Sequence, residues 1–188
     1  MGPTVADAVR ALARGGLVVY PTDTLLGLGA AATDRAAVDR LERAKGRPSG
    51  QTLSLGVSSA EEIETWAELS FESRAWARRH LPGPYTILVR PTSRARRTFG
   101  PSVLPAGGLL GVRVPDHPVA RELARRAGPI TATSANPHGR PPCRTLTEAR
   151  RVFGRAVAVY LPAVPKPSGH PSALVDLSGA HPKHVRRA

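Results

Sequence analysis

Short apolar runs alternate along the chain with segments in which apolar residues recur every three or four positions. Compact apolar runs predict buried strands, and the 3.6-residue period predicts helices that pack by one face. The predicted strands cover residues 17–20, 53–57, 85–90, 110–114, 129–133, 156–161 and 173–177. Predicted helices begin near residues 4, 35, 59, 70, 118 and 145. This alternation predicts an α/β or α+β domain built on one central sheet.

Helix starts are marked by polar residues with capping spacing. A hydroxyl residue followed three positions later by an acidic residue can satisfy two free backbone N–H groups at a helix start. Pairs of this kind are Thr4 with Asp7, Ser59 with Glu62 and Thr145 with Glu148. Asp34 is a further predicted cap, and Pro118 suits the first position of a helix. Gly15 and Gly16 predict the end of the first helix.

The length of 188 residues fits one domain. We assign residues 1–178 to that domain and residues 179–188, which are polar and basic, to a loose C-terminal tail. The Pro/Gly/Ser-rich stretch 162–171 is interpreted as a loop, because a strand pattern follows it. There is no apolar run long enough to cross a membrane and no secretory signal pattern, so a cytoplasmic protein is expected.

The charge balance narrows the possible partners. The sequence has 27 basic and 14 acidic residues, a net charge of +13, which favours nucleotides, pyrophosphate or RNA. Solvated helix faces rich in arginine are the alternative explanation. Aromatic residues make up only 4% of the chain, which gives little support to an RNA-stacking sheet. Cys143 is the single cysteine and the histidines are scattered, so no protein-built metal site is expected.

Two loops in the N-terminal third carry groups suited to an anionic ligand. The stretch 20–29 places the hydroxyls of Thr22 and Thr24 among glycines, where a ligand can approach the backbone. A local hydroxyl turn is the alternative. Lys45 and Arg47 then place two cations on a tight loop after a helix, which suits a triphosphate or the negative end of the helix dipole.

Three further loops lie in the rest of the sequence. Residues 81–86 predict a rigid turn into a strand. Arg113 lies within an apolar strand, and because a buried charge is costly, either a protein carboxylate or a ligand must pair with it. Ser134 and Asn136 follow a buried strand and suit a phosphate or ribose, or alternatively a local Asx turn.

These five loops, in this order, resemble the YrdC/Sua5 family from about residue 17 to residue 154, with a looser match at residues 171–176. The resemblance implies a twisted mixed sheet flanked by helices around a concave, basic cavity. It also implies a threonylcarbamoyl-AMP synthase, a nucleotidyltransferase that converts L-threonine, bicarbonate (or CO2) and ATP, with Mg²⁺, into threonylcarbamoyl-AMP and pyrophosphate. A separate transferase would then modify tRNA with the threonylcarbamoyl group.

The resemblance also implies roles for individual residues. Lys45 and Arg47 would hold the phosphates and act in catalysis. The residues implied for ATP are Lys45, Arg47, Ser134, Asn136 and Arg186, and those implied for threonine are Thr22, Thr24, Arg113 and Ser172. No residue is assigned as a general base.

The sequence departs from the family pattern at several loop positions. These are Leu26, Thr52, Gly56, His138, Ala173 and the chain end 185–188. A diverged paralogue with another substrate and a non-catalytic module that binds tRNA or double-stranded RNA therefore remain alternatives. A carbamoyl-adenylate enzyme like those of hydrogenase maturation is less well supported, because its acylphosphatase-like domain and zinc-finger cysteines do not occur in this sequence.

Overall fold

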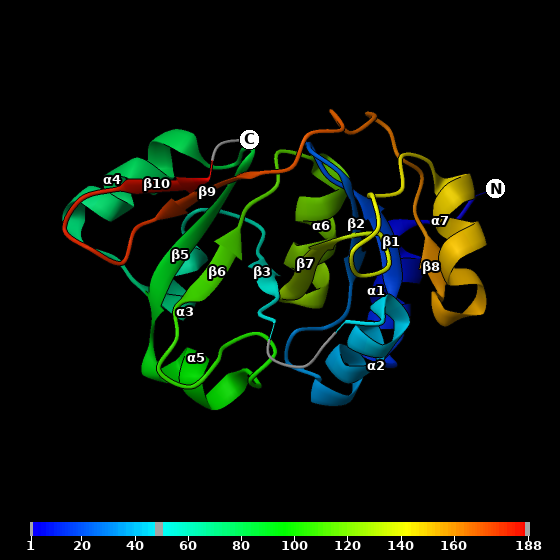
Figure 1. The fold of residues 1–188 in the computed structure, drawn as a ribbon, viewed down its shortest axis with the longest axis horizontal. Coiled ribbons are helices and arrows are strands. Elements are labelled where there is room, and N and C mark those ends of the chain that lie inside the picture. Colours follow the sequence, from blue (N-terminus) through cyan, green and yellow to red (C-terminus); the bar gives the residue numbers. More distant parts are fainter. Residues whose placement is uncertain (1, 48–50, 187–188) are drawn as a thin grey trace.

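The fold is described by a computed structural model for residues 2–47 and 51–186. The end of the loop predicted at 45–50 and the last two residues of the predicted tail lie outside these ranges. The strands form a mixed sheet in the order β10-β9-β5-β6-β3-β7-β2-β1-β8, with β4 paired to β5 (Figure 1). The pairs β1/β8, β3/β6 and β5/β9 are parallel, and the other pairs are antiparallel. The predicted mixed sheet is therefore confirmed.

Most elements follow the predicted alternation, but the helix at residues 93–98 and the strands at residues 26–29, 67–68 and 183–186 are not among the predicted ones. The strands are β1 (Val18–Pro21), β2 (Leu26–Gly29), β3 (Ser54–Gly56), β4 (Ala67–Glu68), β5 (Tyr85–Pro91), β6 (Leu110–Arg113), β7 (Ile130–Ser134), β8 (Val159–Tyr160), β9 (Ala173–Asp176) and β10 (Lys183–Arg186). The helices are α1 (Val5–Ala13), α2 (Arg35–Lys45), α3 (Ile63–Trp66), α4 (Phe71–His80), α5 (Ser93–Thr98), α6 (Pro118–Ala127) and α7 (Leu146–Phe153), with a 3-10 turn at Gly154–Ala156.

Two apolar clusters cover the two faces of the sheet. Val18 and Tyr20 of β1 pack with α1 and α6, whereas Val19 belongs to the larger cluster that includes α2, α5 and α7. Alternate residues of a strand point to opposite faces, so β1 is buried on both sides. Burial on both faces explains why the strand predicted at residues 17–20 is a continuous apolar run rather than an alternating one.

The helix-start predictions are confirmed at four of the predicted sites, one of which is Pro118, the first residue of α6. Thr4 forms the full capping box with Asp7, Asp34 caps α2 through Ala37 N–H, and Thr145 caps α7. The helix predicted after Ser59 is the exception. Here the Ser59 hydroxyl accepts from the Glu62 N–H at 3.3 Å, which is half of the predicted capping box. The Glu62 carboxylate instead accepts hydrogen bonds from the backbone N–H and hydroxyl of Ser58, and only the single turn of α3 follows. The chain leaves α3 to pair β4 with β5, which ends the helix early.

Strand β2 was not predicted, because its Leu-Gly-Leu-Gly sequence combines residues of low strand propensity. It forms because β1 and β7 pair with it on either side. The ring of Tyr20 also occupies the space over Gly27 and Gly29, where an added Cβ atom would lie 2.8 and 2.9 Å from ring carbons. Glycine is therefore required at both positions by close approach rather than by turn geometry.

The prediction of a loose tail at residues 179–188 is wrong for the part that the structure describes. Strand β10 pairs antiparallel with β9 and forms one end of the sheet. All four of its residues are exposed, so no apolar alternation marks this strand in the sequence. The backbone N–H and C=O groups at the free edge of β9 pair with residues 183–186 and hold them as a strand, although the sequence pattern does not indicate one.

Candidate active site

A cavity of about 470 Å³ lies over one face of the sheet. Its wall includes Thr86 and Leu88 of β5 and Gly111 and Arg113 of β6, which share a face because each pair is two residues apart. Small residues at other wall positions leave the space open; these are Gly27, Ser54, Gly111 and Ala132. The strand ends and loops that carry the predicted ligand-binding residues therefore meet around one cavity.

Three guanidinium groups line this cavity. They belong to Arg47, Arg113 and Arg186, and the described lining residues include no Asp or Glu. Such a wall concentrates positive potential where water access is reduced, which favours anions. The predicted basic cavity is present.

Lys45 lies beneath the cavity wall rather than on it. Lys45 is 4% exposed, and its Nζ donates to the carbonyl oxygens of Ser134 and Asn136 at 2.5 and 2.7 Å. Helix α2 ends here because Gly46 adopts the left-handed conformation. Burial, assisted by the neighbouring charge of Arg47, lowers the pKa of Lys45 to about 8. An ammonium has three N–H groups, so these two carbonyls leave one for a ligand.

Arg47 reaches the cavity from the end of α2. Its Nη2 donates to the Thr52 carbonyl at 2.9 Å, and its buried Nε has no partner among the described residues. Burial lowers the pKa of Arg47 from its ordinary value. A buried donor without a partner is costly, so an anion at this position would satisfy it.

The loop after β7 is held by its own side chains. The Ser134 hydroxyl donates to Asn136 Oδ1 at 2.6 Å, and Asn136 Nδ2 donates to the Arg140 carbonyl at 2.6 Å. Ser134 lines the cavity, whereas the Asn136 amide is engaged within the loop. The side chain of Asn136 therefore forms a local turn, which is the second of the two alternatives for this residue. The Lys45 ammonium also holds this loop, by donating to the Asn136 carbonyl.

The Thr22 hydroxyl organises the loop between β1 and β2. It accepts hydrogen bonds from the N–H groups of Thr24 and Leu25 at 3.2 and 3.1 Å, and it donates to the Leu25 carbonyl at 2.7 Å. Thr22 lines the cavity. The Thr24 hydroxyl instead accepts a hydrogen bond from Arg113 Nη2. Thr24 would therefore affect a ligand indirectly, by positioning the Arg113 guanidinium.

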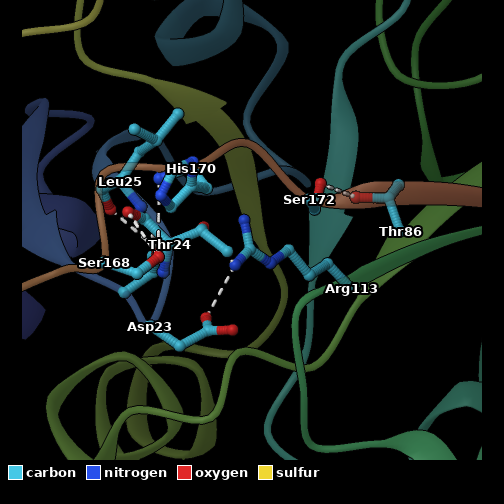
Figure 2. A network of polar contacts seen from close by, with 9 residues as sticks. Asp23, Thr24, Leu25, Thr86, Arg113, Ser168, His170 and Ser172 are labelled. Carbon is cyan, nitrogen blue, oxygen red and sulfur yellow. Dashed lines mark hydrogen bonds and ion pairs between the residues drawn. The ribbon is translucent and has the colours of Figure 1, made fainter. Parts of the chain in front are cut away.

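Arg113 is paired with a carboxylate of the protein (Figure 2). Its Nη2 lies 2.6 Å from Asp23 Oδ1, and the two side chains are 11% and 14% exposed. The alternative that a protein carboxylate neutralises this strand arginine is therefore confirmed. Asp23 was not among the predicted site residues, although its place between Thr22 and Thr24 was a usable signal.

The chain end completes the cavity. Ser172 shares a 2.8 Å hydroxyl contact with Thr86, and Arg186 Nη2 donates to the Ser172 carbonyl at 3.0 Å. In the sequence Thr86 belongs to the predicted turn 81–86, yet in the fold it points to the same face as Leu88 and lines the cavity. Two-residue alternation along β5 could have identified it.

The Pro/Gly/Ser-rich loop 162–171 crosses over the Thr22–Leu25 loop. The N–H groups of Ser168 and Gly169 donate to the Asp23 and Thr24 carbonyls at 2.9 and 2.8 Å. Its other side is held by His117, whose Nε2 lies 3.0 Å from the Pro165 carbonyl. Backbone hydrogen bonds therefore hold loop 162–171 against the Thr22–Leu25 loop. The Pro/Gly/Ser-rich composition of loop 162–171 predicts a loop but does not predict these hydrogen bonds.

Residues 2–47 and 51–186 contain neither a cluster of metal-ligating side chains nor a helix suited to cross a membrane. No three His, Cys, Asp or Glu side chains in this part of the chain are clustered so that they could hold a metal ion. None of the described helices combines the length and the apolar character that a membrane crossing requires.

Comparison with known proteins identifies relatives over almost the whole sequence. The family model for Sua5, YciO and YrdC proteins, described as telomere recombination, matches residues 10–188. A putative threonylcarbamoyl-AMP synthase of Mycobacterium tuberculosis is 38% identical over 183 residues, which cover 97% of this chain and 82% of that protein. The threonylcarbamoyl-AMP synthase of Chromohalobacter salexigens is 40% identical over 157 residues, covering 82% of this chain and 83% of that protein.

Solved structures show the same architecture. The Sua5 protein of P. abyssi complexed with L-threonine matches with a TM-score of 0.87 and 29% identity over 97% of this chain. This chain corresponds to 53% of that protein's length. YciO of E. coli matches with a TM-score of 0.85 and 26% identity, covering 97% of this chain and 88% of YciO.

Proposed function

The chain belongs to the Sua5/YciO/YrdC family, and from this premise we propose that it is a threonylcarbamoyl-AMP synthase. It converts L-threonine, bicarbonate or CO2, and ATP into threonylcarbamoyl-AMP and pyrophosphate. The observation that carries this proposal is the cavity wall with Arg47, Arg113 and Arg186, in a fold whose relatives of similar length are named for this activity. ATP is taken as its Mg²⁺ complex.

We assign the phosphate-binding role to the end of α2 and the loop after β7. The guanidinium of Arg47 would donate to phosphate oxygens, and the Lys45 ammonium would add its charge from beneath the cavity wall while it holds the loop after β7. Ser134 and Asn136 would complete the nucleotide site. Arg186 adds a third cation for ATP from β10. Fixed donors of this kind stabilise the charge that grows on phosphate oxygens during the reaction.

We assign the amino-acid site to the opposite group of loops. Arg113 would bind the substrate carboxylate, with Thr22, Thr24 and Ser172 arranged around it. The neutral amine of threonine attacks CO2, forming the N–C bond, and loses one proton to solvent to give a carbamate. A carbamate oxygen then attacks the α-phosphorus, the bond from this phosphorus to the bridging oxygen breaks, and pyrophosphate leaves. Placing the carbamate in line with the α-phosphate is the main contribution expected of the cavity.

The product is an activated acyl group, and we propose that a separate transferase passes it to tRNA in the cytoplasm. The net charge of +13 also suits direct contact with tRNA. Such contact predicts tRNA binding that weakens steeply with added salt, measured by fluorescence anisotropy.

The test of the activity is pyrophosphate release from ATP and bicarbonate, with L-threonine, with L-serine and without an amino acid. Threonine-dependent release together with a product of the mass of threonylcarbamoyl-AMP is expected. No release from folded protein that binds ATP would refute the proposal, and release with serine alone would indicate a different substrate.

A matched pair of variants tests the site. Arg47→Ala is expected to abolish turnover with an unchanged circular dichroism spectrum. Arg43→Ala removes an exposed arginine from the same helix end and is expected to leave turnover unchanged.

A further inference from the structure

The three arginines of the cavity wall differ in how their charge is balanced. Arg47 and Arg186 donate to the backbone carbonyls of Thr52 and Ser172, and among the described residues no carboxylate lies within 4.0 Å of either guanidinium. Arg113 is the wall arginine that carries a carboxylate partner, Asp23. Burial lowers the pKa of Arg47 and the Glu42 carboxylate, which lies beyond this distance, partly opposes that lowering, whereas Asp23 contacts Arg113 directly. The wall therefore presents two guanidinium groups without a contacting carboxylate and one with such a partner.

The Arg113–Asp23 contact is also directional. Both protein contacts of Arg113, to Asp23 Oδ1 and to the Thr24 hydroxyl, use Nη2. Its Nε is buried without a partner among the described residues, and so is Asp23 Oδ2. The pair thus fixes one arm of the guanidinium fork and leaves the rest for a ligand (Figure 2). A guanidinium held in this way is pre-organised, because its side-chain entropy is lost before the ligand binds.

Asp23 itself is held from two sides. Its carboxylate meets Arg113, and its backbone carbonyl accepts from Ser168 N–H at 2.9 Å. The position of the carboxylate beside Arg113 is therefore set by the crossing of loop 162–171 and not by the Asp23 rotamer alone.

The compensated charge changes which anion Arg113 can hold. A substrate carboxylate carries one negative charge and can bind through the free N–H groups of the guanidinium. A phosphate group carries more charge in the same space, and repulsion from Asp23, which is strong where water is scarce, opposes it. Arg47 and Arg186 have no carboxylate within 4.0 Å among the described residues, so the repulsion of a phosphate there is weaker.

We propose that Asp23 is a positioning and specificity residue that orients Arg113 and reserves it for the amino-acid carboxylate by repelling phosphate. Asp23 keeps the polyphosphate of ATP, and free phosphate, away from the amino-acid subsite. This assignment rests on the proposed function of the cavity.

Two substitutions separate the geometric part from the charge. Asp23→Asn keeps an oxygen that can accept from Arg113 but removes the negative charge, whereas Asp23→Ala removes both. Asp39→Asn is the matched control, because Asp39 is an exposed aspartate on α2. The measurements are the KM for L-threonine, the KM for ATP, and inhibition by inorganic phosphate, all followed by chromatographic detection of threonylcarbamoyl-AMP.

Asp23→Ala is expected to raise the threonine KM by about tenfold or more, the value of one charge-assisted hydrogen bond, with the ATP KM changed by less than about twofold. Asp23→Asn should restore the threonine KM to within about threefold of wild type. In this variant phosphate should compete with threonine at least about tenfold more tightly than in wild type, because the repulsion is removed. Asp39→Asn should behave like wild type in all three measurements.

Two results would overturn the assignment: an unchanged threonine KM in folded Asp23→Ala, or phosphate inhibition in Asp23→Asn no tighter than in wild type. If Asp23→Ala does not fold, the phosphate measurement on Asp23→Asn decides alone. Wild-type protein that forms no product with threonine would overturn the proposed function, and this assignment with it, so the two failures are distinguishable.

Discussion

Lys45 should make the stability of this protein rise between about pH 8 and pH 10.5. Its ammonium is buried, and its pKa in the folded protein is lowered to about 8 from an ordinary value of 10.5. In this window the unfolded chain binds the proton and the folded chain does not, so the free energy of unfolding rises with pH. Below about pH 8 both states are charged, and the burial cost is fully present.

The size of the effect follows from the shift. The lowering of the pKa from 10.5 to about 8 corresponds to roughly 3 kcal/mol in total, and about half of this appears between pH 8 and 9.5. Lys45→Met has no titrating group at this position but a similar length. We therefore expect the difference in the free energy of unfolding, wild type minus variant, to increase over this interval by about half of that total.

The assay is urea unfolding followed by circular dichroism at pH 7.5, 8.0, 8.5, 9.0 and 9.5, with both proteins in the same buffers. Titration of other groups cancels in the difference. Arg47→Gln serves as a second variant, because removing the neighbouring guanidinium raises the Lys45 pKa and moves the rise to higher pH. If the free energy of unfolding changed with pH in the same way for wild type and Lys45→Met, a buried, charged Lys45 would not oppose folding.

Three further variants test single features of the fold: a close packing contact, a loop anchor and a helix cap. Gly27→Ala should destabilise the fold by about 1–3 kcal/mol, because the new Cβ atom would lie 2.8 Å from the Tyr20 ring. His117→Ala should cost about 2 kcal/mol, since it removes both the cap of α6 and the contact to the Pro165 carbonyl, and it should speed protease cleavage within 162–171. Thr4→Ala should cost about 1 kcal/mol by removing the capping box of α1.

Each of these has a control and a contradicting result. For Gly27→Ala the second substitution Tyr20→Leu should recover part of the loss, and additive losses would argue against a clash with the ring. His138→Ala removes an exposed histidine and should change neither stability nor cleavage of 162–171. A Thr4→Ala melting temperature equal to that of wild type would show that α1 does not depend on its cap.

The elements whose signals are local can be located from the amino-acid pattern alone. Apolar runs located β1 and β5, because burial on the sheet requires apolar side chains there. Polar caps located the starts of α1, α2 and α7, because free N–H groups at a helix start need nearby acceptors. The order of the loop motifs identified the family, which the comparisons confirmed.

The hydrogen-bond and ion-pair partners of the polar groups follow from the tertiary structure and not from the sequence pattern. The sequence does not indicate which carboxylate pairs with Arg113. In the fold, β6 lies beside the Thr22–Leu25 loop, and Arg113 contacts Asp23, which is 90 positions away in the sequence. The direction of the Lys45 ammonium, toward two carbonyls of the loop after β7, depends on a contact across 89 positions. Strand β10 exists because β9 offers it an edge. Contacts between distant segments leave no periodic trace in the sequence, since periodicity reports only which face of an element is buried.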